Sequence, residues 1–183
     1  MATVQPVKFT YEDYRTAPAD KRYELLGGDL VMVPAPNLKH QDVQSRLGRR
    51  LAQFIEERAL GKFFFAPCDV VLADTDVVQP DLLFVSRERD HLLSNGDNVR
   101  GAPDLVVEIL SAATAERDRG DKRALYARHG VAEYWLVDPA AETVWIHRPD
   151  AGALTVAHTF GREQTLRSPL LAGFELDLDD IFA

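Results

Sequence analysis

The chain is organised around two apolar stretches, Val77-Val-Gln-Pro-Asp-Leu-Leu-Phe-Val85 and Ala102-Pro-Asp-Leu-Val-Val-Glu-Ile-Leu-Ser111. Most of their residues are β-branched or aromatic, which is typical of strands buried in a parallel or mixed sheet. Each stretch nevertheless contains an acid that would lie inside the sheet, Asp81 in the first and Glu108 in the second. A buried carboxylate is costly unless it is paired or bound to a metal ion, so both acids are candidates for function.

Length and composition indicate an ordinary globular protein. The chain has 183 residues, of which 46% are hydrophobic and 27% charged, so we expect one domain over residues 1–183 with a core at about 20–160. No apolar stretch approaches the ~20 residues of a membrane span, and the N-terminus lacks the features of a signal peptide. We therefore expect a cytoplasmic protein without a membrane partner. Cys68 is the single cysteine and excludes an internal disulfide, and no Cys/His cluster has zinc spacing.

The negative net charge argues against a protein that coats nucleic acid. At pH 7 the formal net charge is −8, whereas proteins that coat nucleic acid usually carry a net positive surface. An enzyme acting on nucleic acid is not excluded, because a metal-binding site must itself be acidic and a local basic face can coexist with a negative total.

Periodicity and turn residues predict both helices and strands. Apolar residues spaced by three and four predict an amphipathic helix over 38–59, and Gly27-Gly28 predicts a hairpin between strands at 22–26 and 29–33. A short helix begins after Thr10, and a second long helix runs from about Thr114 to Gly130. The remaining predicted strands span 62–73, interrupted near Pro67, then 77–85, 102–111, 131–139, 143–148 and 154–159. This order predicts an α/β fold with a mixed sheet.

The spacing of the two acids permits them to meet across neighbouring strands. Two adjacent carboxylates repel each other unless a cation neutralises them, and hard oxygen ligands select Mg²⁺ or Mn²⁺. Lys122 shares a helical face with Leu125 and Tyr126, so we expect it to turn toward the core and provide a donor for a phosphate or a water molecule. Two acids and a lysine around a hard metal ion are suited to cleaving phosphodiester bonds.

The sequence also allows the same acids to have a purely structural role. Asp81 follows a proline and could begin a strand with a local turn. Glu108 could form a structural ion pair with Lys122 or Arg123, since buried ion pairs also occur without catalytic function. Asp118 stands four residues before Lys122 and could hold it in an ordinary helical pair.

Several motifs in a fixed order resemble one protein family from about residue 10 to the C-terminus. These motifs are Tyr23-Glu-Leu-Leu-Gly-Gly, His40 opening a helix, Gln79-Pro-Asp-Leu, Pro103-Asp-Leu-Val-Val-Glu-Ile-Leu-Ser, Asp121-Lys, Tyr126, Gly130-Val and Glu133-Tyr-Trp-Leu-Val-Asp-Pro. Together they resemble the Uma-two family, a restriction-endonuclease-like group of the PD-(D/E)XK nuclease superfamily. The resemblance implies a restriction-endonuclease-like mixed β-sheet core flanked by helices, with additional N-terminal and C-terminal hairpins.

The resemblance also implies roles for individual residues. Asp81 matches the acid of the Pro-Asp motif and Glu108 the acid of the (D/E)XK motif, so both would ligate Mg²⁺ or Mn²⁺ together with the Ile109 carbonyl. The sequence departs from the superfamily pattern at Leu110, where the catalytic lysine would stand. In this family the lysine is displaced to the following helix, which points to Lys122.

Glu24 is a further candidate. It alternates with apolar residues in a predicted strand, so the pattern alone allows either a solvated side chain or one that faces inward. The family resemblance matches it to an additional upstream acid, which makes Glu24 a candidate catalytic residue beside Asp81, Glu108 and Lys122.

The expected function is therefore a metal-dependent endonuclease that hydrolyses nucleic acid, with DNA as the expected substrate. Two alternatives remain: a non-catalytic interaction module on the same fold, and a metal-dependent hydrolase of a small phosphoester, which the negative net charge would suit. Exposed edge strands in the C-terminal hairpins also suggest a homodimer.

Overall fold

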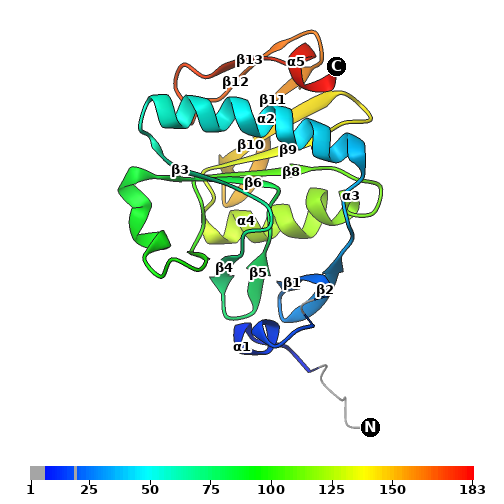
Figure 1. Cartoon of the computed structure of the whole chain (residues 1–183), viewed down its shortest axis with the longest axis vertical. Helices are drawn as coiled ribbons and strands as arrows, with labels where there is room; N and C mark the ends of the chain where they lie inside the picture. Colours follow the sequence, from blue (N-terminus) through cyan, green and yellow to red (C-terminus); the bar gives the residue numbers. More distant parts are fainter. Residues whose placement is uncertain (1–6, 19) are drawn as a thin grey trace.

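The computed structural model describes residues 7–18 and 20–183, and its strands form two large sheets and one small sheet (Figure 1). The larger sheet has six strands in the order β11-β10-β9-β8-β6-β3. Strands β8 and β9 run parallel and every other neighbouring pair runs antiparallel, which confirms the mixed sheet. The strand bounds are β3 (Gly61–Phe65), β6 (Leu82–Ser86), β8 (Leu105–Ile109), β9 (Glu133–Asp138), β10 (Thr143–Asp150) and β11 (Ala153–Gly161).

Helices cover both faces of this sheet. Helix α2 (Leu38–Glu57) lies on one face and α4 (Arg123–His129) on the other, so the strands β6 and β8 are buried on both sides (Figure 1). Because side chains alternate along a strand, Leu105 and Val107 of β8 pack with α2, whereas Val106 packs with α4. Glu108 therefore belongs to the set of side chains on the α4 side.

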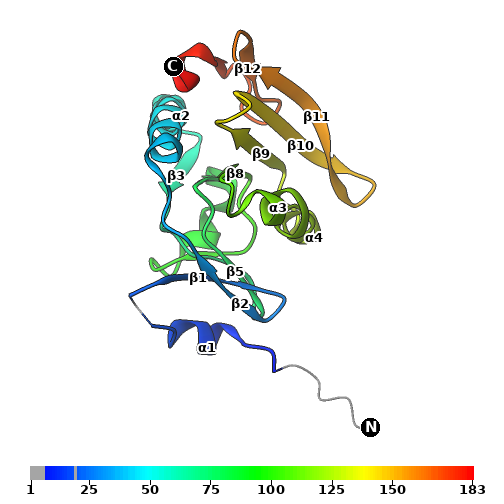
Figure 2. The same cartoon turned by 90° about the vertical axis from the view of Figure 1, so that its right-hand side faces the viewer.

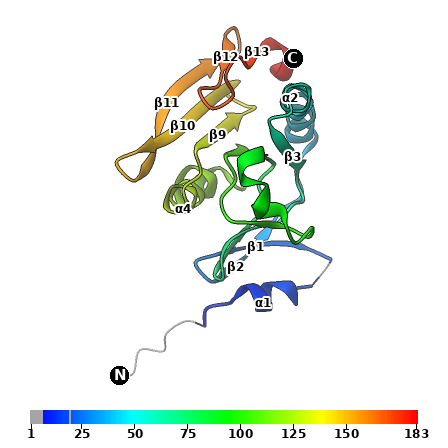
Figure 3. The ribbon, with the colours of Figure 1, turned by 90° about the vertical axis from the view of Figure 1, so that its left-hand side faces the viewer.

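The second sheet has five short strands in the order β2-β1-β5-β4-β7 and lies at the opposite end of the molecule from the β10–β11 hairpin (Figures 2 and 3). Helix α1 (Tyr11–Arg15) packs beneath it, and Thr10 and Asp13 form the capping box at its start. Gly27 and Gly28 both have positive φ in the predicted β1–β2 turn. The strand bounds are β1 (Arg22–Leu26), β2 (Asp29–Val33), β4 (Val70–Ala73), β5 (Asp76–Val78) and β7 (Val99–Arg100).

Two predicted stretches are divided between the sheets: 62–73, whose interruption near Pro67 was predicted, and 77–85, which was predicted as one strand. The stretch 62–73 separates into β3 and β4, and the stretch 77–85 separates into β5 and β6 with Gln79, Pro80 and Asp81 between them. Pro80 has no N–H for a strand ladder, and the N–H of Gln79 donates to the carboxylate of Glu24 instead of to a neighbouring strand. Asp81 thus lies in the link between the two sheets, immediately before β6.

The helix predicted from Thr114 to Gly130 is also interrupted. It consists of a short α3 (Ala115–Arg117), one π-helical turn η2 (Asp118–Lys122) and α4, and it ends at Gly130 with φ of 83°, as predicted. A 3₁₀ helix, η1 (Arg87–Leu93), follows β6.

The C-terminal segment forms structure that its sequence pattern did not predict. It contains β12 (Thr165–Arg167), β13 (Glu175–Asp177) and α5 (Asp179–Phe182). Their apolar residues, among them Leu166, Leu176 and Ile181, join the cluster between α2 and the six-stranded sheet. In the part of the chain that the structure describes, none of the helices is long and apolar enough to cross a membrane.

Candidate active site

One cavity of about 230 Å³ lies where the two sheets meet and is lined by every side chain predicted for the site: Glu24, Asp81, Glu108 and Lys122. Ile109 lines it as well. We call it the first cavity. Glu24 comes from the five-stranded sheet, Asp81 from the link between the sheets, Glu108 from β8 and Lys122 from the π-helical turn. The fold thus brings together residues that lie far apart in the sequence.

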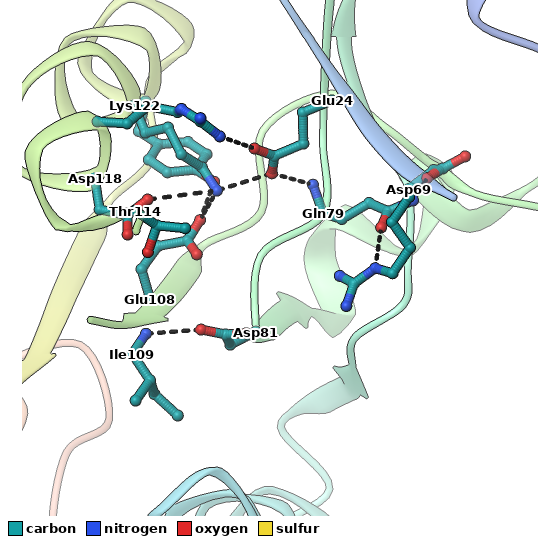
Figure 4. Close-up of polar contacts among 12 residues, drawn as sticks. Glu24, Asp69, Gln79, Asp81, Glu108, Ile109, Thr114, Asp118 and Lys122 are labelled. Carbon is teal, nitrogen blue, oxygen red and sulfur yellow. Dashed lines mark hydrogen bonds and ion pairs between the residues drawn. The ribbon is translucent and has the colours of Figure 1, made fainter. Parts of the chain in front are cut away.

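Lys122 is the centre of an ion-pair cluster in this cavity (Figure 4). Its Nζ lies 2.8 Å from Glu24 Oε1, pairs with Glu108 Oε1, and lies 3.9 Å from Asp118 Oδ1. Glu24, Glu108 and Lys122 are only 2%, 4% and 3% exposed. The side chain of Glu24 therefore faces inward, and the solvated alternative does not apply.

Asp81 approaches Glu108 through the pairing of their strands. The antiparallel register pairs Leu82 with Val107, and one further step along it places Asp81 opposite Glu108. Asp81 Oδ2 accepts a hydrogen bond of 2.7 Å from the N–H of Ile109 and lies 3.1 Å from Nε2 of His40 (Figure 4 shows the first contact). These contacts fix the Asp81 carboxylate at the wall of the cavity.

The surroundings of the cluster raise the pKa values of both Glu108 and Lys122. Burial raises the pKa of Glu108 well above its usual value; Lys122 opposes this shift, whereas Asp118, Asp81 and Glu24 add to it. For Lys122, burial favours the neutral amine, but the carboxylates of Glu108, Glu24 and Asp118 outweigh it and raise the pKa. The site therefore has more negative than positive charge, and its lysine stays protonated at neutral pH.

The sequence placed Tyr126 beside Lys122 on a helical face and among the family motifs, but assigned it no role in the site. In the structure its hydroxyl donates a 2.7 Å hydrogen bond to Glu108 Oε1, and burial together with Glu108 raises the pKa of this hydroxyl well above its usual value. Tyr126 thus stays a donor and orients Glu108. A tyrosine on a buried helical face carries a polar hydroxyl that needs a hydrogen-bond partner. This requirement was the signal in the sequence that could have predicted a contact between Tyr126 and a polar group of the site.

The sequence also assigned no role to His40 beyond opening a helix. Its backbone N–H donates to the N-cap residue Asn37, and its ring is buried against Asp81. Only the tertiary fold brings α2 beside Asp81, so the spacing of residues gave no sign of this contact.

Two oxygens at the wall of the first cavity are suited to a hard divalent cation. Asp81 Oδ1 and Glu108 Oε2 both make no hydrogen bond to another described residue, whereas the second oxygen of each carboxylate is held by the protein. Two oxygens of this type in a site with excess negative charge suit Mg²⁺ or Mn²⁺. No set of three acidic, histidine or cysteine side chains within residues 7–18 and 20–183 is arranged around one ion, so the Ile109 carbonyl or water molecules would complete the shell.

Comparisons with known proteins give the same family as the sequence motifs. A crystal structure described as "a putative nuclease belonging to DUF820 from Anabaena variabilis ATCC 29413" matches with a TM-score of 0.79 over 97% of this chain and 98% of that chain. Its sequence identity is 21%, so this likeness shows the fold. A search of curated proteins found no match. The family model "Uma2: Putative restriction endonuclease" matches residues 10–179, and the chain therefore belongs to the Uma2 family.

Proposed function

We propose that this protein is a metal-dependent endonuclease that hydrolyses phosphodiester bonds of DNA. The observation that carries the proposal is the convergence of Asp81, Glu108 and Lys122 on the first cavity, where one carboxylate oxygen of each acid accepts no hydrogen bond from a described residue. Membership of the Uma2 family and the nuclease-like fold support the same reaction class.

The metal ion would be Mg²⁺ or Mn²⁺, held by the carboxylates of Asp81 and Glu108 and by the Ile109 carbonyl. When bound, such an ion lowers the pKa of water and offsets the negative charge that develops on the phosphate. The protein prepares this site by holding one oxygen of each carboxylate. His40 and the N–H of Ile109 fix Asp81, and Tyr126 fixes Glu108.

Lys122 would act as a charged donor. Because the surrounding acids raise its pKa, it keeps its proton at neutral pH and is not suited to remove one from water. Its ammonium can instead orient the attacking water or donate to a phosphate oxygen, which stabilises the transition state electrostatically. Glu24 holds the ammonium at 2.8 Å and itself accepts from the N–H of Gln79, so it positions Lys122.

One observation favours a second candidate function, a non-catalytic interaction module. Lys122 is already paired with Glu24 and Glu108, and such a buried ion network can exist for structure alone. The two functions differ in metal dependence, because an ion network that is complete without a cation gains no stability when Mg²⁺ is added.

The test combines cleavage with thermal unfolding. Supercoiled plasmid and a small chromogenic phosphodiester are incubated with the protein in Mg²⁺, Mn²⁺ or EDTA. We expect metal-dependent nicking of the plasmid and a higher melting temperature in Mn²⁺, since a ligand of the folded state stabilises it by mass action. Asp81→Asn should remove both effects.

Three outcomes would contradict the proposal. An equal thermal shift in Asp81→Asn places the ion elsewhere, and unaltered plasmid with a metal-stabilised protein removes the nuclease function. Turnover of the small phosphodiester alone would support the small-molecule hydrolase instead.

A further inference from the structure

A second cavity, of about 670 Å³, adjoins the first and has no role in the reaction proposed above. Its walls come from α1, from the start of β1 and from residues 95–100. Arg22 and Gln79 line both cavities, so a bound molecule can extend from one into the other. The basic and tyrosine side chains of the second cavity are Tyr11, Tyr14, Arg15, Lys21, Arg22, Tyr23 and Arg100.

Three of these basic side chains are available to an anion. Lys21, Arg22 and Arg100 form no ion pair with a carboxylate of the described residues, although the protein carries a net charge of −8. The guanidinium of Arg100 lies 4.3 Å from the ring centroid of Tyr11, and Arg22 donates to the side chain of Gln79. Glu12, Asp69 and Asp97 also line the second cavity, but Glu12 pairs with Arg15, and Asp69 accepts hydrogen bonds from Tyr14 and Gln79. An anionic group beside Arg22 and Arg100 would thus find cations that no carboxylate of the described residues pairs with.

The tyrosines provide flat apolar surfaces beside these cations. The rings of Tyr11 and Tyr14 stack with a centroid distance of 6.3 Å and an interplanar angle of 20°. Tyr23 is only partly buried, and its ring and hydroxyl have no aromatic or hydrogen-bond partner within the described residues. Basic side chains that follow a phosphate backbone, combined with aromatic rings on which bases stack, are typical of sites that bind single-stranded nucleic acid.

The second cavity is also held rigidly against the candidate active site. The Tyr14 hydroxyl and the Gln79 side-chain amide both donate to Asp69 Oδ1, each at 2.8 Å. The backbone N–H of Gln79 donates to Glu24, which holds Lys122. A ligand in the second cavity would therefore be placed at a defined distance from the ion-pair cluster.

A third cavity, of about 440 Å³, also adjoins the first. It shares Arg22, Pro36 and Asp81 with the first cavity, and Gln41, Gln44 and Phe65 are among its other lining residues. Arg22 lines all three cavities, so they meet at its side chain, and Asp81 lines both the first and the third. A chain molecule bound beside the acids of the first cavity could therefore continue into either of the other two, as internal cleavage requires.

We propose that the second cavity binds the unpaired nucleotides next to the scissile phosphate, so that the enzyme acts on single-stranded DNA; this inference rests on the proposed nuclease function. In a duplex the faces of the bases are covered by neighbouring base pairs and cannot stack on Tyr23. Binding of a long duplex also depends on many phosphate contacts, whereas the second cavity offers few unpaired cations.

Fluorescence anisotropy in EDTA measures binding without cleavage, using a short labelled single strand and the same strand in a duplex. We expect the full-length protein to bind the single strand at least about tenfold more tightly, because a stacked base contributes on that scale. Tyr23→Ala should weaken this binding by about tenfold. Arg100→Gln should reduce the slope of log affinity against log salt by about 0.7, the value for one phosphate contact with a single strand.

Lys62→Gln is the matched control, because Lys62 is exposed, forms no ion pair with a described residue and lines none of the three cavities. It removes the same charge and should leave the salt slope unchanged. Melting temperatures show that each variant is folded. If Arg100→Gln unfolds because Tyr11 loses its partner, Tyr23→Ala still tests the site, because the Tyr23 side chain makes no hydrogen bond to a described residue.

The outcomes separate this inference from the proposed function. Equal affinity for strand and duplex, or wild-type binding by folded Tyr23→Ala, overturns the single-strand site even if plasmid is nicked. Preference for the single strand, lost in Tyr23→Ala, supports the site even if no cleavage occurs, and in that case it is the catalytic proposal that fails.

Discussion

Glu108 and Glu133 are buried glutamates on the neighbouring strands β8 and β9, yet their surroundings differ. Glu133 is completely buried, and both of its carboxylate oxygens accept hydrogen bonds. Oε1 accepts from the indole of Trp135 at 2.7 Å and from the hydroxyl of Ser168 at 2.6 Å, and Oε2 accepts from the N–H of Leu170 at 3.2 Å. These bonds attach the C-terminal segment to the six-stranded sheet.

Glu108 has a different set of neighbours. One oxygen is held by Tyr126 and Lys122, the other has no hydrogen bond from a described residue, and three further acids lie close enough to raise its pKa. The first cavity opens beside it. The comparison shows that burial of an acid does not by itself indicate function. A buried acid with every acceptor satisfied holds the fold together, whereas an acid crowded by like charges beside a cavity is prepared for a cation.

The largest expected effect comes from Lys122→Met, which breaks the cluster around Glu108. Cleavage should fall by about 10²-fold or more, the usual scale for an electrostatic group in a transition state. The variant should also be less stable, because Glu24 and Glu108 lose their buried counter-ion. Rates are measured well below the melting temperature of the variant.

A double variant separates the two contributions of Lys122. Adding Glu108→Gln to Lys122→Met removes one uncompensated charge and should recover part of the stability without recovering cleavage. Unchanged cleavage in folded Lys122→Met would show that the lysine is only a structural partner of the acids.

An intermediate effect is expected from Glu133→Gln, on stability alone. The amide group of glutamine would place a donor where Glu133 now accepts a hydrogen bond, and an unsatisfied buried group costs about 1–3 kcal/mol. The urea midpoint should fall at constant m value, with cleavage per folded molecule as in the wild type. Glu163→Gln, at an exposed position, is the control. A large loss of cleavage in folded Glu133→Gln would remove the contrast between the two glutamates.

The smallest effect concerns His147 on β10, beside the strand of Glu133. Burial lowers the pKa of His147; the nearby Arg123 adds to this shift and a hydrogen bond with the Tyr134 carbonyl opposes it. The unfolded chain therefore binds more protons just below the usual histidine pKa of about 6.5, so stability falls as the pH decreases through that range. His147→Gln should flatten this dependence in urea titrations, while His158→Gln, at an exposed position, should not. An unchanged pH dependence in His147→Gln would assign the proton uptake to another group.

Local signals in the sequence predicted much of the fold. The three- and four-residue spacing of Val43, Leu47 and Leu51 predicted the buried face of α2, and Gly130 predicted the end of α4. The family resemblance is confirmed by the match over residues 10–179. The roles assigned to Asp81, Glu108, Ile109, Lys122 and Glu24, and a homodimer, stay predictions.

By itself the sequence determined where most helices, strands and turns lie and which of their faces are buried. Periodicity and turn chemistry depend on residues that are close together in the chain. Only the tertiary structure decided that the strand before Asp81 breaks between two sheets, that His40 meets Asp81, and that the π-helical turn sets Lys122 among three acids. The tertiary structure also decided that both carboxylate oxygens of Glu133 accept hydrogen bonds, whereas only one oxygen of Glu108 accepts one from a described residue. These differences depend on contacts between residues far apart in the chain, and the same local pattern is compatible with either environment.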